Sequence, residues 1–275
     1  AVEFPGTKTH LLAFVGCIVL TCALPLEVFP ETSMCQFNQT VTLFWLGTLP
    51  VVVAVYTFAN FLLDKLFHQS KIQKGAHYTT KQWWTEVIWV APTLWLVLGL
   101  FYFMFLHHDS MPEIVFNETS DWSEILNGVL QTVGFFLFWD FFEYALHRTF
   151  HSVPLLYRSI HKVHHQFTAP SLLSGLAFHP IEGFLFFVPV LVLFWYPVHG
   201  PTFGILFGAF NTFDLLAHAG YEFSLYEKLR FVVGTTKHHD YHHEHFKPNY
   251  AVYLSIWDTI LGTSQCNLKN ERQQQ

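Results

Sequence analysis

The chain has 275 residues, and its composition excludes an ordinary water-soluble domain: 52% of the residues are hydrophobic, 19% are aromatic and only 12% are charged. The net charge of −6 identifies no partner, because in a membrane protein the side that each charge occupies matters more than the sum. The 18 histidines concentrate between residues 147 and 245. We therefore expect a membrane protein whose chemistry lies in its second half.

Four apolar stretches, residues 11–26, 41–63, 87–106 and 125–139, predict transmembrane helices, and the fourth is expected to continue as a helix to residue 146. Crossing a bilayer core of about 30 Å takes about 20 helical residues. These stretches are apolar throughout, whereas a soluble bundle would show an apolar stripe on each helix. The fold class is therefore an all-α integral membrane protein with a transmembrane region over 1–146.

The basic residues predict the orientation of these spans. The loop 64–84 contains four lysines, whereas segments 27–40 and 107–124 contain no Lys or Arg and several acidic residues. By the positive-inside rule, the loop 64–84 and the histidine-rich region face the cytosol. Two glycosylation sequons, at Asn38 and Asn117, fall in the segments that are expected to lie on the opposite side.

A second apolar region follows the first histidines and predicts a membrane hairpin over residues 183–217. Its two arms are short for full spans, and the break at Tyr196-Pro-Val-His-Gly-Pro201 has the composition of a turn. Histidine clusters flank the region on both sides, so the chain must return to the face that it left. Residues 147–275 are thus predicted to form a cytosolic helical cap with this hairpin, in one structural unit with the spans.

Three histidine clusters carry the chemistry. The first is His147-Arg-Thr-Phe-His151, which continues the fourth span, and the others are His161-Lys-Val-His164-His165 and His238-His-Asp-Tyr-His242-His243. Residues three or four positions apart share one face of a helix, so each cluster directs several imidazoles to one place. With His239, His242 and His243 from the third cluster, eight candidate ligands exceed the needs of one metal and indicate two ions, with His218 as a ninth candidate. Imidazole suits zinc, copper, nickel and iron alike.

Several acidic residues are candidates for hydrogen-bonding to the outer nitrogens of metal-bound histidines, which fixes their orientation. Asp140 and Glu143 precede His147 within an apolar span, where charges call for partners. Asp240 is proposed for the third cluster, and Asp214, one turn before His218, is either such a partner or a direct ligand. His179 is either a partner of the same kind or a cap of the hairpin.

These motifs resemble the fatty acid hydroxylase superfamily, whose membrane di-iron enzymes include sterol desaturases, C4-methylsterol oxidases and cholesterol 25-hydroxylases. The resemblance runs from about Phe138 to Thr263 and rests on the three ordered histidine boxes, on Phe178-His-Pro-Ile-Glu182 and on Trp257-Asp-Thr-Ile-Leu-Gly-Thr263. It implies that His179 and His238 support the ligands from outside. The metal ligands that it implies are His147, His151, His161, His164, His165, His218, His239, His242 and His243.

The resemblance also implies the activity: an oxygen-dependent lipid oxidase of the endoplasmic reticulum membrane with two iron ions, acting on a sterol with its site facing the cytosol. Electrons would come from NAD(P)H through cytochrome b5 or a flavoprotein reductase, because the chain has no Gly-rich nucleotide-binding motif. Zinc is a possible occupant of the purified protein. The nearest alternative is a hydroxylase or desaturase of fatty acyl chains, sphingoid bases or long-chain aldehydes with the same metals.

Two further alternatives belong to other classes. A zinc-dependent membrane hydrolase needs three or four protein ligands, fewer than the histidines available here. A metal transporter would place its histidines inside the spans, at the depth of the bilayer centre. In this sequence the clusters lie just beyond the ends of the spans. Both classes are therefore disfavoured.

Overall fold

A computed structural model describes residues 34–107 and 121–265, and within these ranges the chain is helical. The described residues form no β-strand, although an isolated bridge pairs Lys71 with Tyr221. The predicted span 11–26, the sequon at Asn117 and most of the segment 107–124 lie outside the described residues. The expected all-α class is confirmed for the part of the chain that is described.

Three helices are long and apolar enough to cross a membrane: α2 (Met34–Phe67), α3 (Thr80–Leu106) and α4 (Trp122–Ser152). They contain the predicted spans 41–63, 87–106 and 125–146. Thr79 caps α3 by accepting a hydrogen bond from the Gln82 amide, and Asp121 caps α4 by accepting one from the Ser123 amide. Large apolar side chains such as Leu43 and Phe44 point away from the protein, as expected of helices solvated by lipid.

The position of Asn38 corrects one expectation. The sequence placed this sequon in a loop, but α2 already begins at Met34 and the Asn38 side chain is only 3% exposed. Helix α2 packs along α3 there, and the rings of Phe37 and Tyr102 lie 5.2 Å apart. A buried helical asparagine is a poor acceptor of a glycan, because glycosylation requires an accessible loop.

The region predicted as a hairpin consists of two helical arms. The first comprises α6 (Pro180–Phe187) and the 3₁₀ helix η5 (Val188–Phe194), and the second is α7 (Gly200–Ala217). His179 caps α6 and His199 caps α7, in each case by accepting a backbone N–H with the imidazole. An apolar core joins the arms to α3 and α4 through residues such as Met104, Phe136 and Leu193.

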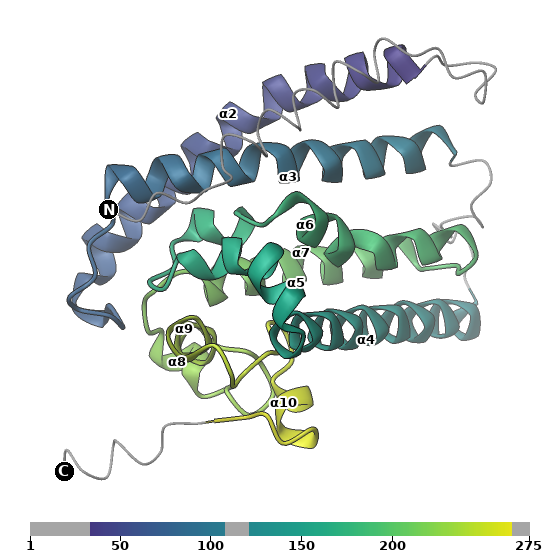
Figure 1. The fold of residues 1–275 in the computed structure, drawn as a ribbon. Coiled ribbons are helices and arrows are strands. Elements are labelled where there is room, and N and C mark those ends of the chain that lie inside the picture. The colour runs from purple at the N-terminus through teal and green to yellow at the C-terminus, as the bar shows by residue number, and fades with distance from the viewer. Residues whose placement is uncertain (1–33, 108–120, 266–275) are drawn as a thin grey trace.

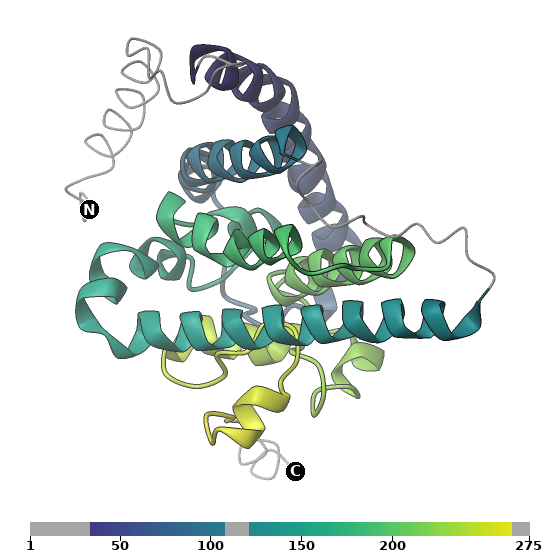
Figure 2. The ribbon, with the colours of Figure 1, turned by 90° about the vertical axis from the view of Figure 1, so that its right-hand side faces the viewer.

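The long helices form layers, with α2 and α3 on one side, α6 and α7 in the middle and α4 on the other side (Figure 1). The view from the side shows α4 running below α6 and α7 (Figure 2). The remaining elements are short and join the ends of the long helices. They are η1 (His68–Ser70), α5 (Pro154–Ser159), η3 (His161–Gln166), η4 (Leu172–Leu176), α8 (Ser224–Glu227), α9 (Thr236–His245) and α10 (Ile256–Ile260).

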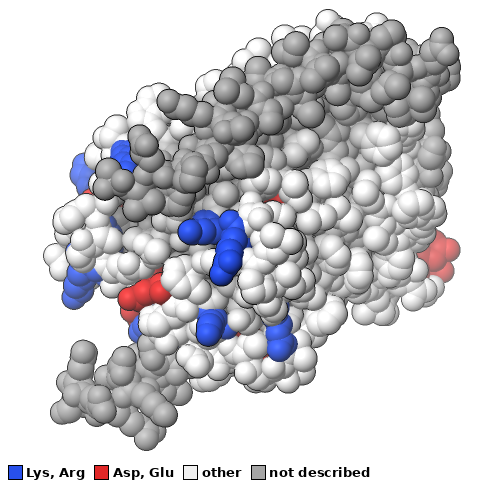
Figure 3. Space-filling view, in the orientation of Figure 1, with Lys and Arg blue, Asp and Glu red and all other residues white. Residues whose placement is uncertain are grey.

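Charge is distributed unevenly over this arrangement. On the face seen in Figure 3, Lys and Arg side chains gather toward the end that carries the short helices, with some acidic side chains among them, and acidic side chains also appear at the opposite end. Helix α4 shows the same difference: Asp121 and Glu124 lie at its start, and Arg148 lies near its end. The three long helices therefore have one basic end, and the histidines lie toward it.

Candidate metal centre

Four separate segments present the histidines that the sequence singled out. His147 and His151 lie one turn apart near the end of α4, and Pro154 begins α5, which reverses the chain toward η3. Helix η3 carries His161, His164 and His165 as a 3₁₀ turn. His218 ends α7, and α9 carries the remaining three, His239, His242 and His243.

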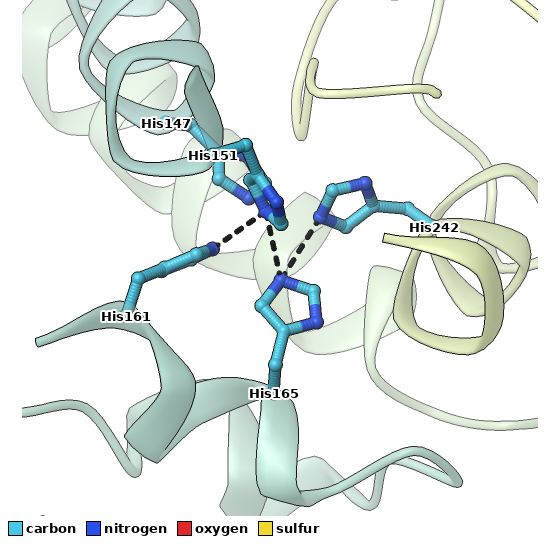
Figure 4. A group of neighbouring side chains, drawn as sticks. All are labelled: His147, His151, His161, His165 and His242. Carbon is cyan, nitrogen blue, oxygen red and sulfur yellow. Dashed lines mark hydrogen bonds between the residues drawn. The ribbon is translucent and has the colours of Figure 1, made fainter. Parts of the chain in front are cut away.

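The structure divides these nine histidines into two groups, in each of which the potential ligand atoms lie within 4.8 Å of one another. The group of five comprises His147, His151, His161, His165 and His242 (Figure 4). Within it, the Nε2 atom of His151 lies 2.8 Å from that of His161 and 3.0 Å from that of His165. The Nε2 atom of His165 is in turn 3.1 Å from that of His242.

The second group comprises His164, His218, His239 and His243. The Nε2 atom of His239 lies 3.0 Å from that of His218 and 3.1 Å from that of His243. The groups adjoin, because the rings of His165 and His243 are 4.8 Å apart. The arrangement therefore offers two neighbouring places for an ion.

The outer nitrogens show why these rings suit metal ions. The Nδ1 atom of His147 lies 2.6 Å from the Tyr250 carbonyl oxygen, and that of His242 lies 2.6 Å from the Pro248 carbonyl oxygen. Since a carbonyl oxygen only accepts, each Nδ1 must carry the proton, and each Nε2 presents a lone pair to the centre. The Nδ1 atom of His218 likewise donates to a carbonyl oxygen, that of Asp214, at 2.8 Å.

Several inward lone pairs at hydrogen-bond distance repel one another unless a cation or a proton lies between them. The Nε2 atom of His147 is buried and has no hydrogen-bond partner. Protons are disfavoured, because burial lowers the pKa of the histidines outside the spans well below the ordinary value and neighbouring imidazoles lower it further. This applies to His161, His164, His165, His239, His242 and His243. Neutral imidazoles of this kind are metal ligands, so the donor set fits two transition-metal ions.

Two buried carboxylates support the histidines, and neither was assigned a role from the sequence. Glu182 on α6 has an oxygen 2.5 Å from the Nδ1 atom of His161, and both side chains are at most 1% exposed. Asp258 on α10 accepts a hydrogen bond of 3.0 Å from His238 and bonds of 2.9 Å from the amides of Tyr250 and Ala251. Asp258 thereby fixes the position of Tyr250, whose carbonyl oxygen accepts the hydrogen bond from His147. The sequence did contain a signal for both, because each carboxylate stands in one of the motifs, 178–182 and 257–263, on which the family resemblance rests.

The acidic residues that the sequence did single out lie in different surroundings. Asp140 accepts a hydrogen bond of 2.6 Å from the indole of Trp257, so it anchors α10 rather than a histidine ring. Asp240 accepts one of 3.1 Å from Gln73. The Asp214 carboxylate lies 3.4 Å from the Nδ1 atom of His218.

The other two predicted supporting residues are placed as follows. Glu143 lines a cavity and is 8% exposed. His179 caps α6, and its ring lies 6.0 Å from that of Trp89.

An apolar cavity reaches the two groups. Its walls come from α4, α6 and α7 and are largely aromatic, with Trp139, Phe186, Phe187, Phe207 and Phe210. Five of the nine histidines line the same cavity: His147, His161, His164, His218 and His239. A lipid chain or ring system held by these walls would therefore meet both candidate ion positions.

Fold and site together define a helical membrane protein whose paired histidine groups suit metal ions and line an apolar cavity. Comparison with known proteins agrees: residues 132–263 match the model of the Fatty acid hydroxylase family. The resemblance to this family that the sequence motifs predicted is thereby confirmed. No solved structure matches the chain.

Several curated proteins that are similar to this chain are named as oxidases and desaturases of sterols. Lathosterol oxidase of Mus musculus is 27% identical over 240 residues, which is 86% of this chain and 78% of the mouse protein. Delta(7)-sterol 5(6)-desaturase of Candida dubliniensis is 28% identical over 86% of this chain and 61% of its own length. C-4 methylsterol oxidase of Schizosaccharomyces pombe is 39% identical over 50% of this chain and 48% of its own length.

Proposed function

We propose that this protein is an oxygen-dependent membrane oxidoreductase that uses two iron ions to oxidise a C–H bond of a sterol. The observation that carries the proposal is the aromatic cavity whose inner end is formed by histidines of both groups. Its relatives, named as sterol oxidases and desaturases, support the substrate class. The nine histidines of the two groups are the proposed ligands, five for one ion and four for the other.

Bound iron would supply the oxidising power that attack on an alkyl carbon requires, because acid and base side chains cannot provide it. The protein contributes the geometry. The carbonyl oxygens of Tyr250 and Pro248 hold His147 and His242 with their lone pairs inward. Glu182 holds the Nδ1 atom of His161 from behind, which fixes the orientation of that imidazole. The aromatic walls exclude water, so the reacting carbon meets the centre in a site of low polarity.

The electrons are proposed to come from NAD(P)H through a separate partner, cytochrome b5 or a flavoprotein reductase. His151 is the single member of the two described groups that is not fully buried, and its ring lies 5.4 Å from that of Tyr157 on α5. The exposed residues Arg158 and Lys162 follow this tyrosine in the sequence. A basic surface beside the least buried ligand suits an acidic electron donor.

The uneven distribution of basic residues supports the proposed location, the endoplasmic reticulum membrane with the centre on the cytosolic side. The hairpin arms, α6 with η5 and α7, are proposed to dip into the bilayer, so that a lipid reaches the cavity without crossing water. Segment Pro180–Phe194 is apolar but shorter than a span. The same cavity would also hold a fatty acyl chain, a sphingoid base or a long-chain aldehyde, and these remain the alternative substrates.

The test is an assay of iron-loaded protein with a reductase and a panel of sterols and fatty acids, run in air and without oxygen. We expect an oxidised sterol that forms only when iron, oxygen and electrons are all present. If oxidised product formed from acyl lipids and not from sterols, the proposed substrate would change from a sterol to an acyl lipid. Protein that holds two zinc ions and remains active without oxygen would overturn the proposal in favour of a hydrolase.

A further inference from the structure

Helix α10 packs against α4 on the side that faces away from the other long helices. In both ribbon views it lies across α4 from α6 and α7 (Figure 1 and Figure 2). The indole of Trp257 donates a hydrogen bond of 2.6 Å to Asp140, and its ring centroid is 5.0 Å from that of Phe141. The hydroxyl oxygens of Tyr144 and Thr263 are 2.9 Å apart. These contacts fix the level of α10 along α4.

That level is where the apolar stretch of α4 ends. The stretch covers residues 125–139, and α4 has the length and hydropathy of a membrane span. The contacts with α10 lie at residues 140–144, which are within about 8 Å of Trp139 along the axis at 1.5 Å per residue. The headgroup region on each side of the apolar core is about 5–8 Å thick. Helix α10 is therefore at the depth of the headgroups, not in the water beyond them.

The outward side of α10 is apolar, although this helix is short and lies at the surface. Its inward side carries Ser255 and Asp258, which are both buried. The exposed large side chains of α10 and the residue after it are Ile256, Ile260 and Leu261, with Ile260 65% exposed. A helix that faces water would carry polar residues on its outer side. Next to α10, α4 exposes the ring of Phe141, so the two apolar surfaces meet.

The same surface continues on the segment that follows α8. The Ser255 hydroxyl donates a hydrogen bond of 2.8 Å to the Arg230 carbonyl oxygen, which holds this segment against α10. Phe231 and Val232 follow, and both are exposed. The guanidinium carbon of Arg230 lies 5.2 Å from the centroid of the Phe231 ring, and Lys228 is exposed nearby in the sequence. Aromatic rings with neighbouring cations are typical of a membrane interface, where the cations reach lipid phosphates.

We propose that α10 and the segment 231–232 lie in the headgroup region of the bilayer and are covered by lipid. The surface concerned, which we call the apolar foot, comprises Phe231, Val232, Ile256, Ile260 and Leu261. Single exposed apolar side chains are common, but an apolar surface that extends over neighbouring elements marks an interaction site. The occupant is lipid because the foot continues the lipid-facing side of α4 at interfacial depth and has basic residues beside it. The inference does not depend on what the protein oxidises.

Lipid contact on the outside of α10 also has an effect on its inside. Asp258, on the inward side, accepts hydrogen bonds from the backbone amides of Tyr250 and Ala251. The Tyr250 carbonyl oxygen lies 2.6 Å from the Nδ1 atom of His147. Because the bilayer holds α10 against α4, it also holds the helix that orients this candidate ligand.

The depth of the apolar foot is measured with spin labels in nanodiscs. Ile260→Cys and Phe231→Cys are made in protein whose four native cysteines are replaced by alanine, and each is labelled with a nitroxide. Phe44→Cys, on the exposed side of α2, serves as the lipid control, and Glu244→Cys, at an exposed position of α9, serves as the water control. We expect both foot labels to behave like the label at position 44. They should collide often with oxygen, which dissolves in lipid, and rarely with a water-soluble nickel complex.

Two results would overturn the inference. Foot labels that collide with the nickel complex as often as the label at position 244 would place the foot in water. Foot labels shielded from both reagents would show that protein covers the foot, and magnetic coupling between labels would identify that protein as a second copy of the chain.

A charge placed on the foot tests the effect on the centre. Ile260→Asp is expected to lower both the thermal unfolding midpoint in nanodiscs and the metal retained after dialysis against a chelator, because a carboxylate is unfavourable against lipid. Ser264→Asp adds the same charge at an exposed polar residue just after α10 and should leave both quantities unchanged. Equal effects of the two variants, or no effect of Ile260→Asp, would overturn the inference.

Discussion

Replacing Glu182 by glutamine tests whether a buried charge behind His161 strengthens metal binding. The Glu182 carboxylate is fully buried, and its oxygen lies 2.5 Å from the Nδ1 atom of His161. In Glu182→Gln, the amide oxygen still accepts the hydrogen bond from the imidazole, so the ring keeps its tautomer. Only the charge of a carboxylate at this position is removed. Removing a partner of this kind typically weakens metal binding about 10- to 100-fold, which corresponds to about 1.4–2.8 kcal/mol.

The affinity is measured as the metal retained by purified protein after dialysis against graded concentrations of a chelator. Glu182→Leu, which also removes the hydrogen bond, should lose more metal, because it leaves a buried N–H without a partner at a cost of about 1–3 kcal/mol. Glu222→Gln is the matched control, since Glu222 is 42% exposed and pairs with Lys237 at 3.8 Å. Metal retention by Glu182→Gln equal to that of the wild type would refute the reasoning.

Three further predictions concern the ligand groups and the packing around them. His243→Ala leaves three histidines in its group and is expected to reduce bound metal from about two ions per chain to about one, whereas His242→Ala leaves four and should retain more, as measured by elemental analysis; equal losses would contradict the division into two groups. Asp258→Asn should lower the free energy of unfolding by about 2–4 kcal/mol, because hydrogen bonds to a buried carboxylate contribute about 1.5–3 kcal/mol each. Burial raises the pKa of Asp258, but the hydrogen bond from His238 and further hydrogen bonds outweigh this effect and hold the pKa below its ordinary value. The stability that the charge provides is therefore present above the ordinary pKa of about 4 and is lost as the pH falls through the pKa of the folded protein. The unfolding midpoints of wild type and variant should therefore converge in acid. Gly183→Ala brings a methyl group to 2.3 Å from the Thr93 Cγ2 atom and should destabilise the protein by about 1–3 kcal/mol, while Thr93→Ser, which removes that atom and keeps the hydroxyl, should restore stability in the double variant; no rescue would argue against direct contact.

The local features of the site followed from the sequence because they depend on short spacings. The apolar lengths predicted α2, α3 and α4, and the spacing of four residues placed His147 and His151 on one face of α4. His218 was recognised as a candidate because it stands where an apolar arm ends. These inferences need only helical periodicity and the thickness of a bilayer.

The division of the histidines into groups was not predictable in the same way. His164 and His165 are adjacent in the sequence but belong to different groups, and so do His242 and His243. Neighbouring residues point about 100° apart on the α-helix α9 and about 120° apart on the 3₁₀ helix η3, so each pair faces two directions. Only the packing of α9 against η3 and α7 decides which ring meets which ion. Glu182 was missed for a similar reason, since its contact with His161 spans 21 residues.

The part played by α9 has a consequence for biogenesis. Helix α9 contributes His242 to one group and both His239 and His243 to the other. Neither set of ligands is complete until this late segment has left the ribosome and folded back onto helices that were inserted earlier. Loading of either group with metal would thus wait for the synthesis of α9, and a nascent or truncated chain that lacks this helix cannot complete either set of ligands.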